Sequence, residues 1–410
     1  MRRLKKTLWT KNFTLVTAAS ALGAVGGIAG GFALSFLVFD ETGSTLASAL
    51  ILAIQLVPFF VLPLFLAPVM DRLPRKPFLV AGDLIDGVLY ALMGLYLLKF
   101  EFSYAAYLGY SLLLACLESF DELAFQSIYP KLIPEGMEQQ GYAVSTTLYP
   151  ILRVLMLPLA GVLLDAVGAA WILIGQGGLS LLAALIESNI DITEHRREGG
   201  EKLLTLRQWR ADIKEAAEYL KNERGVTGIF SYMAVTNGVA SGYSSILVAF
   251  FRTFPGFTAA MYSLFSVFEF AGRTLGGAVQ YKLKLAKEKK FGFTFLVYQI
   301  YETMDMCLLW LPYPLMLANR ALVGFLGANS ATMRQAAMQS YIPENLRARL
   351  NAFQNMLITA ASGVFALAIG ALGEILDYRL CVSVCGATAF LAAWLLVWRR
   401  RADVRKIFEK

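Results

Sequence analysis

Three carboxylates share one face of a single apolar stretch, and carboxylates at this spacing can carry protons. Glu118, Asp121 and Glu122 stand at positions i, i+3 and i+4 in residues 103–128, so a helix presents them together. Arg153 lies in the next apolar stretch. At about 1.5 Å per residue, Glu118 and Arg153 lie at similar depths of about 16–18 Å from the same ends of their helices.

Burial and mutual repulsion both disfavour ionised carboxyl groups, so three of them facing one arginine cannot all be charged. We therefore expect at least one of Glu118, Asp121 and Glu122 to hold a proton that it can exchange. The alternative is a structural Glu118–Arg153 ion pair, with Asp121 and Glu122 close to water. The spacing alone does not decide between these interpretations.

Further ionisable side chains lie in other apolar stretches. Glu269 and Arg273 stand at i, i+4 in residues 257–281, which is ideal spacing for an ion pair within one helix. They are a second coupling candidate, although a structural pair also explains them. The remaining groups are two carboxylate pairs, which we expect to brace the fold, and two arginines that could serve as gates: Asp83 and Asp86, Glu302 and Asp305, Arg320 and Arg334.

The elements that position these groups are twelve long apolar stretches. Hydrophobic residues make up 57% of the chain and charged residues only 16%, which is outside the usual composition of a soluble domain. A span needs about 20 mostly apolar residues, and its backbone must bond within its own helix. The sequence therefore predicts an all-α integral membrane protein with spans at 13–38, 45–68, 77–98, 103–128, 141–164, 168–188, 225–251, 257–281, 291–311, 313–340, 348–375 and 379–398.

Basic residues set the expected orientation. Nearly all of those between the spans lie in the two tails and the even-numbered connections, and the exceptions are Lys99, Arg252 and Arg379. The positive-inside rule then places both termini in the cytoplasm and the protein in the cell inner membrane. The first span is long and lacks a small-residue cleavage site, so it is read as uncleaved. The net charge of +7 is scattered over several loops, which argues against nucleic-acid binding.

The sequence contains few residues that could bind a metal ion or a cofactor. The single histidine, His195, falls in the central loop, and of the four cysteines only Cys381 and Cys385 share a helix face. Neither pattern completes a metal site. The sequence has no nucleotide-binding loop of the G-x-x-x-x-G-K-[ST] type. We therefore expect no metal, no cofactor and no ATP-driven reaction.

An internal repeat relates the two halves of the chain. Gln126 through Glu135 match Gln335 through Glu344 at an offset of 209 positions, and Gly161 and Gly370 keep the same offset. We interpret this register as a duplication of six helices. The sequence then predicts two pseudo-symmetric six-helix bundles, residues 1–190 and 225–410. Residues 191–224 form a cytoplasmic linker with an amphipathic helix.

This plan resembles the major facilitator superfamily over nearly the whole chain. The local match is Asp71-Arg72-Leu-Pro-Arg75-Lys76 after the second span, which is similar to the family signature G-x-x-x-D-R-x-G-R-[RK]. Ala67 and Pro74 replace its two glycines. The resemblance implies that Asp71, Arg72, Arg75 and Lys76 form a cytoplasmic latch. A basic loop that only sets topology is the alternative.

A second resemblance concerns the fifth stretch. Leu157-Pro158-Leu-Ala-Gly161 is similar to the end of the G-P-x-x-G-G element of exporters in this superfamily. Pro158 removes a helix hydrogen bond and kinks the helix, and Gly161 allows close helix approach. The resemblance is nearest to the bacterial macrolide-efflux and enterobactin-exporter group, which implies export.

The expected function is secondary active transport by alternating access, with proton-coupled export of a small amphiphilic organic molecule or drug. An importer, a facilitator, or a lipid or lysolipid transporter of the same fold is the alternative. An intramembrane enzyme would need a nucleophile with its base or a metal cluster. The spans contain no histidine and offer only carboxylates, so we do not expect an enzyme. A sensor would usually bring a soluble signalling domain. The expected partners are the substrate, protons and the lipid bilayer, and we expect a monomer.

Overall fold

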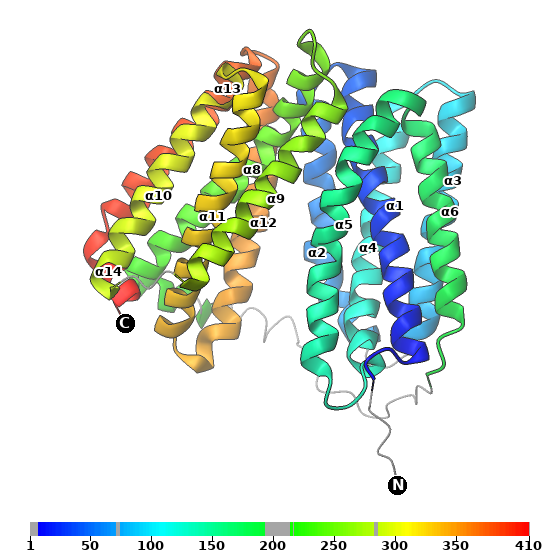
Figure 1. Cartoon of the computed structure of the whole chain (residues 1–410), viewed down its shortest axis with the longest axis horizontal. Helices are drawn as coiled ribbons and strands as arrows, with labels where there is room; N and C mark the ends of the chain where they lie inside the picture. The colour runs from blue at the N-terminus through cyan, green and yellow to red at the C-terminus, as the bar shows by residue number, and fades with distance from the viewer. Residues whose placement is uncertain (1–6, 71–73, 193–213, 216, 283–285, 410) are drawn as a thin grey trace. The chain divides into compact units, whose positions relative to one another are not determined.

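The computed structural model describes the chain except residues 1–6, 71–73, 193–213, 216, 283–285 and 410. Twelve long helices run through the described part, and they match the twelve predicted spans one for one (Figure 1). Their bounds are α1 Lys11–Thr42, α2 Thr45–Met70, α3 Lys76–Lys99, α4 Tyr104–Leu132, α5 Glu138–Val167, α6 Ala169–Ser188, α8 Arg224–Thr253, α9 Ala259–Lys282, α10 Lys287–Cys307, α11 Tyr313–Tyr341, α12 Glu344–Gly373 and α13 Tyr378–Ala392. The all-helical membrane fold predicted from the sequence is confirmed.

Hydropathy separates these helices into two groups. Seven of the described helices, namely α1, α3, α5, α6, α8, α12 and α13 with its continuation to Trp398, are long and apolar enough to cross a membrane. An apolar segment also runs through Thr45–Phe59 of α2. The other four, α4, α9, α10 and α11, carry ionisable side chains within their length, among them Glu118, Glu269, Glu302 and Arg320. Groups of this kind are expensive inside a membrane and are usually functional.

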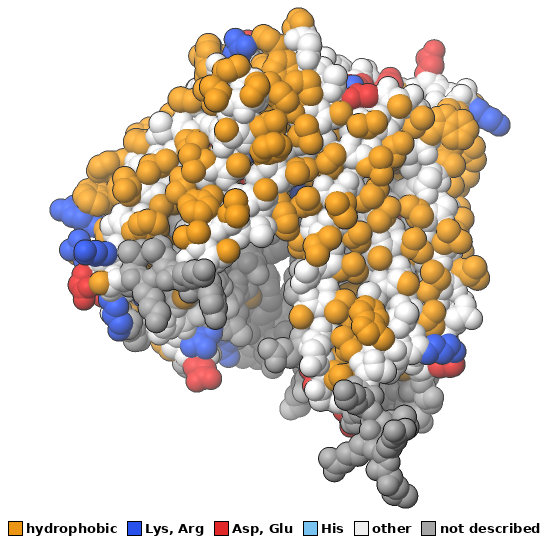
Figure 2. All heavy atoms as spheres, in the orientation of Figure 1, with side chains coloured by type: hydrophobic (Ala, Val, Ile, Leu, Met, Phe, Trp, Pro, Cys, Tyr) orange, Lys and Arg blue, Asp and Glu red, His pale blue; other side chains and the backbone are white. Residues whose placement is uncertain are grey.

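The outer surface suits a lipid environment. Large apolar side chains such as those of Leu155, Leu185 and Val364 are more than half exposed. Figure 2 shows hydrophobic side chains over the sides of the helices, while lysine, arginine and acidic side chains gather near the helix ends. A bilayer would cover this apolar surface, because its hydrocarbon core meets helices along their middle turns.

The helices fall into two compact units, and each contains a short piece from the opposite half of the sequence. The first unit comprises Met1–Thr42, Ile54–Leu203 and Thr258–Ser263, and the second comprises Gly43–Ala53, Leu204–Phe257 and Leu264–Lys410. The first turns of α2 thus belong to the second unit, and the start of α9 belongs to the first unit. A repeat in the sequence does not reveal this exchange of helix ends.

Within each unit, a glycine of the sixth long helix lies at a close contact with the third. In the first unit α6 packs closely on α3 (Figure 1), and a Cβ placed on Gly177 would lie 2.6 Å from the carbonyl oxygen of Gly87. In the second unit a Cβ on Gly386 of α13 would lie 2.6 Å from Cγ of Met306 in α10. Gly177 and Gly386 are 209 positions apart. The glycines and the helices they join correspond between the two halves, but the partner residues do not, because Gly87 corresponds to position 296 and not to Met306.

The last residues form a helix, whereas the sequence predicted only a basic tail there. After α13 the chain continues through the wider helical turns Ala393–Trp398 into α14, Arg401–Glu409. Val404, Ile407 and Phe408 of α14 are buried in a core cluster with residues of α8 and α10. Their i, i+3, i+4 spacing is the signal that predicts such a helix.

Candidate functional site

The carboxylates of α4 do not share one environment. Asp121 packs against α3, where a Cβ placed on Gly82 would lie 2.7 Å from the Oδ1 atom of Asp121. Glu122 is exposed, and its Oε1 atom accepts a hydrogen bond from the side-chain amide of Gln126. A glycine at position 82 therefore gives Asp121 the space to lie between helices, while Glu122 remains on an open face.

Acidic side chains from two other helices join the acids of α4. Asp83 and Asp86 come from α3, and Glu187 comes from the end of α6. Asp83 and Glu187 are close enough to form a hydrogen bond between their side chains. Asp121 is in electrostatic contact with Asp83, Asp86 and Glu118. We call Asp83, Asp86, Glu118, Asp121 and Glu187 the carboxyl cluster.

The carboxyl cluster has few partners of its own. The Oδ1 atoms of Asp86 and Asp121 and the Oε2 atom of Glu187 are buried with no hydrogen bond. Glu187 is only 3% exposed. Within the described part of the chain, no lysine or arginine forms an ion pair with any member. A hydrogen bond between two carboxyl groups requires a proton on one of them, so this arrangement is suited to holding protons.

Arg153 was the expected partner of Glu118. Its side chain is exposed on α5, and no ion pair between Arg153 and Glu118 occurs among the described residues. The members of the cluster on α3 and α6 take part instead. Asp83 and Asp86 were expected to brace the fold, and Glu187 was not among the predicted site residues. The signal available in the sequence was Gly82, Gly87 and Gly177, because small residues mark close helix approach.

A cavity of about 370 Å³ lies beside the carboxyl cluster in the same unit. Side chains of α1, α4 and α5 line it, and Glu122 is the only charged residue among them. The lining residues are Thr17, Ser20, Ala24, Glu122, Phe125, Tyr129, Val144, Ser145, Leu148 and Tyr149. Its volume falls in the range of sites that bind small organic molecules.

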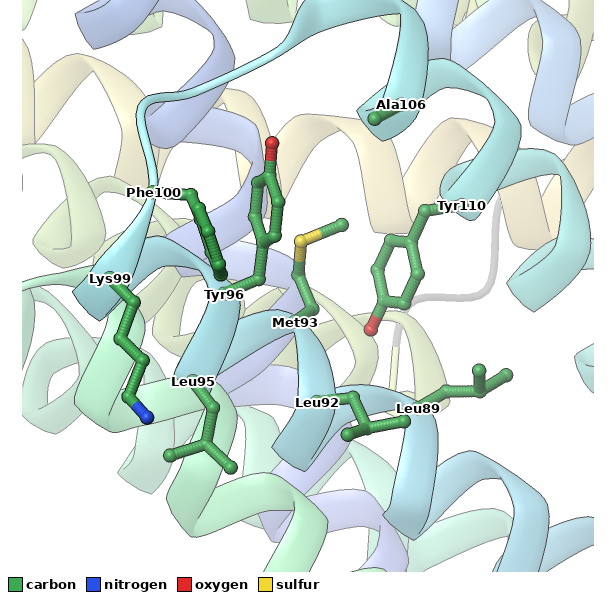
Figure 3. Close-up of a pocket in the computed structure, with 9 residues that line it drawn as sticks. All are labelled: Leu89, Leu92, Met93, Leu95, Tyr96, Lys99, Phe100, Ala106 and Tyr110. Carbon is green, nitrogen blue, oxygen red and sulfur yellow. The ribbon is translucent and has the colours of Figure 1, made fainter.

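A second cavity, of about 450 Å³, lies between the ends of α3 and α4 and differs in character (Figure 3). Figure 3 shows Tyr96 and Tyr110 on either side of Met93, with Leu92 and Leu89 below, while Lys99 extends away from this group. None of its described lining residues carries a carboxylate. It is an apolar groove with one basic residue at its edge.

The second unit contains a buried ion pair. Arg320 of α11 is 2% exposed and pairs with Asp305 of α10. Its guanidinium also donates to the side-chain oxygen of Asn319 at 3.0 Å and lies 3.4 Å from the hydroxyl of Tyr243. Asp305 and Glu302 both line a water-sized cavity of about 10 Å³. Asp305 therefore has a counter-ion, unlike the carboxyl cluster of the first unit.

Tyrosine hydroxyl groups form hydrogen bonds with two other buried polar side chains of this region. The hydroxyl of Tyr232 donates to Glu302 at 3.2 Å and lies 3.1 Å from the hydroxyl of Tyr301. Arg334 donates to the hydroxyl of Tyr298 at 3.0 Å. The second unit thus keeps its buried charges in a hydrogen-bonded network, as a rigid structural element would.

Glu269 and Arg273 form an ion pair within α9 at 2.7 Å, at the predicted i, i+4 spacing. A glycine brings this turn against α11, since a Cβ on Gly324 would lie 2.1 Å from the carbonyl oxygen of Glu269. The side chain of Arg273 remains 59% exposed. The pair is accessible, and α11 holds its backbone in place.

Two carboxylates tie the exchanged helix ends into their units. In the first unit, Oδ2 of Asp165 accepts from the backbone N–H of Ala260 at 3.3 Å, in the first turn of α9. In the second unit, Oε1 of Glu374 accepts from the N–H of Leu46 at 2.9 Å, in the first turn of α2. A carboxylate is favoured there, because the first N–H groups of a helix have no partner within it. We call these contacts the carboxylate clasps.

A glycine four residues earlier makes each clasp possible. A Cβ on Gly161 would lie 2.7 Å from Cα of Ala260, and one on Gly370 would lie 2.5 Å from Cβ of Ala49. Gly161 therefore lies at a close helix contact, as a small residue in a span allows. Pro158 lies inside α5, one turn before Gly161.

Glu374 lies just beyond the end of α12 and outside its membrane span. Burial raises the pKa of Glu374, but hydrogen bonds from Leu46, Ser44 and Thr45 lower it by more, so the net pKa lies below its ordinary value. The hydroxyls of Ser44 and Thr45 donate to Oε1 at 2.7 and 3.1 Å. The clasp is therefore strongest when Glu374 is ionised.

The expected latch lies partly outside the described residues. Asp71 and Arg72 fall in that gap, as does most of the predicted amphipathic linker helix. Arg75 is buried just before α3, and Nζ of Lys76 donates to the carbonyl oxygen of Ser188 at 2.7 Å. Lys76 thus connects the start of α3 to the end of α6 within the first unit.

The sequence matches the family model of the Major Facilitator Superfamily over residues 14–298 and 304–409. The chain belongs to the Major Facilitator Superfamily. It is therefore a multi-pass membrane transporter, and the superfamily predicted from the sequence is confirmed. The narrower macrolide-efflux and enterobactin-exporter group stays a prediction. No curated protein matches the sequence.

Solved structures of other members share the fold of this Major Facilitator Superfamily chain. A peptide transporter in complex with alafosfalin aligns with a TM-score of 0.71 at 11% identity, over 99% of this chain and 98% of its own. The nucleoside transporter NupG gives 0.70 at 11%, over 95% and 99%. A bacterial homologue of the lysosomal transporter Spinster, inward-facing and unoccupied, gives 0.65 at 14%, over 97% and 94%. At these identities the likeness concerns the fold alone.

Proposed function

We propose that this transporter is a proton-coupled exporter of a small amphiphilic organic molecule that works by alternating access. The carboxyl cluster is the observation that carries the proposal. Five acidic side chains from three neighbouring helices meet in one unit without a basic partner among the described residues. Such a group holds protons, and it can release them only when water or a substrate charge reaches it.

In the proposed cycle, protons bind the cluster from the outer side and leave to the inner side as substrate moves out. Asp121 is the central member, because it contacts the acids of both α3 and α4. Glu118 belongs to the same cluster, and Glu122 lines the adjacent cavity. Arg153 is proposed to interact with the cluster only in another conformation. Glu269 and Arg273 are proposed to respond from the second unit as an accessible ion pair.

The direction of transport rests on the Pro158–Gly161 element. Its resemblance to the exporter motif supports outward movement of substrate, and Gly161 lies at a helix contact that a transport cycle could use. The two bundles, residues 1–190 and 225–410, are proposed to alternate as rigid bodies joined by residues 191–224. Asp71, Arg72, Arg75 and Lys76 are proposed to latch the cytoplasmic side.

The proposed location is the inner membrane, with both termini in the cytoplasm and the chain acting as a monomer. Cysteine labels at Ser103 and Thr253 should react with an impermeant reagent from outside intact cells, while labels at Arg75 and Lys287 should not. Equal labelling from both sides would contradict this topology.

Transport into inside-out vesicles tests the proposed function. We expect at least one of three fluorescent amphiphiles, one cationic, one neutral and one anionic, to accumulate only when the vesicle interior is acidic. Collapse of the pH gradient should stop accumulation. The exposed outer residue Glu101, changed to Gln, is the control that should keep it. Accumulation that ignores the gradient, or uptake only into right-side-out vesicles, would contradict proton-coupled export.

A further inference from the structure

The cavity between α1, α4 and α5 has one charged wall residue. Among the described residues that line it, Glu122 is the only carboxylate and none is a lysine or arginine. The side-chain amide of Gln126 donates a hydrogen bond to Oε1 of this carboxylate. Among the described residues, no lysine or arginine pairs with Glu122. A carboxylate in an apolar pocket without a counter-ion favours a cationic occupant over a neutral or anionic one.

Three of the five hydroxyl groups of the wall already donate within the protein. Thr17 donates to the carbonyl oxygen of Phe13 at 2.7 Å, and Ser145 donates to that of Tyr142 at 3.1 Å. The hydroxyl of Tyr129 donates to the carbonyl oxygen of Gly141 at 2.7 Å. The polar wall thus offers few free donors. The occupant should carry its charge on an apolar body rather than on a set of hydrogen-bonding groups.

Aromatic rings supply the remaining surface. The rings of Phe125 and Tyr129 lie 5.0 Å apart, and Tyr149 on the facing helix is 50% exposed. Aromatic faces attract organic cations within about 6 Å of the ring centre. One carboxylate and three aromatic rings in a pocket of about 370 Å³ match a single positive charge shielded by apolar groups.

Position along α4 links this cavity to the proposed cycle. Glu122 and Asp121 are adjacent in the sequence, and the two carboxylates are in electrostatic contact. Glu122 lies ten residues before the end of α4 at Leu132, which is about 15 Å at about 1.5 Å per residue. A cation bound at Glu122 would stabilise the ionised form of Asp121. Protonation of Asp121 would in turn weaken the binding of the cation and favour its release.

We propose that this cavity binds a lipophilic organic monocation, with Glu122 as its counter-ion. The inference rests on the proposed function in one respect, namely that the bound cation is the exported substrate. The groove of Figure 3 is the internal contrast, because it is apolar but carries Lys99 in place of a carboxylate.

Equilibrium binding in lipid nanodiscs tests the proposal without a membrane gradient. Tetraphenylphosphonium and tetraphenylborate have nearly the same shape and opposite charges, so they isolate the effect of charge. We expect the wild-type protein to bind the cation and not the borate, after subtraction of binding to empty nanodiscs. Glu122→Gln should raise the Kd for the cation by about tenfold.

Two further variants separate loss of binding from loss of folding. Glu122→Asp keeps the charge and should retain most of the affinity for tetraphenylphosphonium. Lys99→Gln removes the charge of the other groove and should leave binding unchanged. Thermal unfolding of each variant identifies any misfolded sample. Wild-type affinity in Glu122→Gln, or stronger binding of tetraphenylborate than of tetraphenylphosphonium, would overturn the proposal.

Binding and transport can fail separately. Cation binding that depends on Glu122, together with transport that ignores the pH gradient, would contradict the proposed coupling and leave this site standing. Proton-driven transport of a neutral or anionic amphiphile, with no binding of tetraphenylphosphonium, would overturn this site and leave the coupling standing.

Discussion

Asp165 and Glu374 occupy equivalent positions, 209 residues apart, and each accepts a hydrogen bond from the first turn of a helix contributed by the opposite half of the sequence. Each follows a glycine by four residues, Gly161 or Gly370, and each glycine lets the two helices touch. The duplication has therefore preserved a contact as well as a fold. A transporter that alternates between two open sides must break such contacts in one of its states.

Removal of a clasp should loosen the helix end that it holds. Glu374→Ala leaves the N–H of Leu46 without its acceptor, and we expect a loss of about 0.5–1 kcal/mol, because Glu374 is also exposed to water. Thermal unfolding in detergent measures the loss. Asp377→Ala is the matched control, since Asp377 caps α13 only through the N–H of Arg379 at 2.9 Å.

The control variant should lose similar stability without effect on α2. A cysteine at Leu46 should react faster with an impermeant label in Glu374→Ala than in Asp377→Ala. Equal labelling rates in the two variants would show that Glu374 does not hold the start of α2.

Acid should weaken the same clasp. The pKa of Glu374 is lower in the folded protein than its ordinary value of 4.5, so its contribution to stability is fully present above that value. The contribution disappears as pH falls through the lower folded pKa. The difference in unfolding free energy between wild type and Glu374→Gln should be constant above about pH 5.5 and shrink in stronger acid. A difference that grows on acidification would contradict this assignment.

The ion pair of the second unit should be costly to break from one side. Asp305→Asn leaves the buried guanidinium of Arg320 without its counter-ion, and we expect a loss of about 3–5 kcal/mol in unfolding free energy. The double variant Asp305→Asn with Arg320→Gln should recover much of this loss. Asp403→Asn breaks the exposed pair with Lys406 and should change stability by less than about 0.5 kcal/mol. Equal costs for Asp305→Asn and Asp403→Asn would contradict the buried pair.

The sequence predicted the faces of single helices better than the contacts between them. Glu118 and Asp121 were identified because i, i+3 spacing places them on one side of α4. Asp83, Asp86 and Glu187 were not assigned to the same site, since periodicity does not say which helices are neighbours. Close packing brings them together, and it depends on Gly82, Gly87 and Gly177, whose partners become visible only in the folded chain.

The repeat could be predicted from the sequence, whereas the exchange of helix ends could not. The offset of 209 could be read from the sequence because Gln126–Glu135 and Gln335–Glu344 both begin with Gln and end with Ile-Pro-Glu. The sequence did not predict the partners of Gly161 and Gly370, because Ala260 and Ala49 belong to other helices. The interaction expected between Glu118 and Arg153 was inferred from depth alone, and similar depth does not fix the direction of a side chain.

The latch should depend on the first copy of the repeat. Gln280 lies 209 positions after Asp71 and is its counterpart in the second copy. Asp71→Asn should reduce transport strongly, while Gln280→Asn should have little effect, because only the first copy keeps the charged pattern Asp71-Arg72-Leu-Pro-Arg75-Lys76. Initial rates of amphiphile efflux from cells, normalised to the amount of protein in the membrane, measure the difference. Equal rates for the two variants would return this loop to a role in topology alone.

Proton movement through the carboxyl cluster is the most direct test of the account. In proteoliposomes that hold a pH-sensitive dye, addition of a transported amphiphile should trigger a proton flux in the wild-type protein without an imposed gradient. In Asp121→Asn the flux should vanish while exchange of labelled for unlabelled substrate continues, because the site still binds substrate but can no longer carry a proton. Wild-type proton flux in Asp121→Asn and in the corresponding single amide variants of Asp83, Asp86, Glu118 and Glu187 would contradict the account.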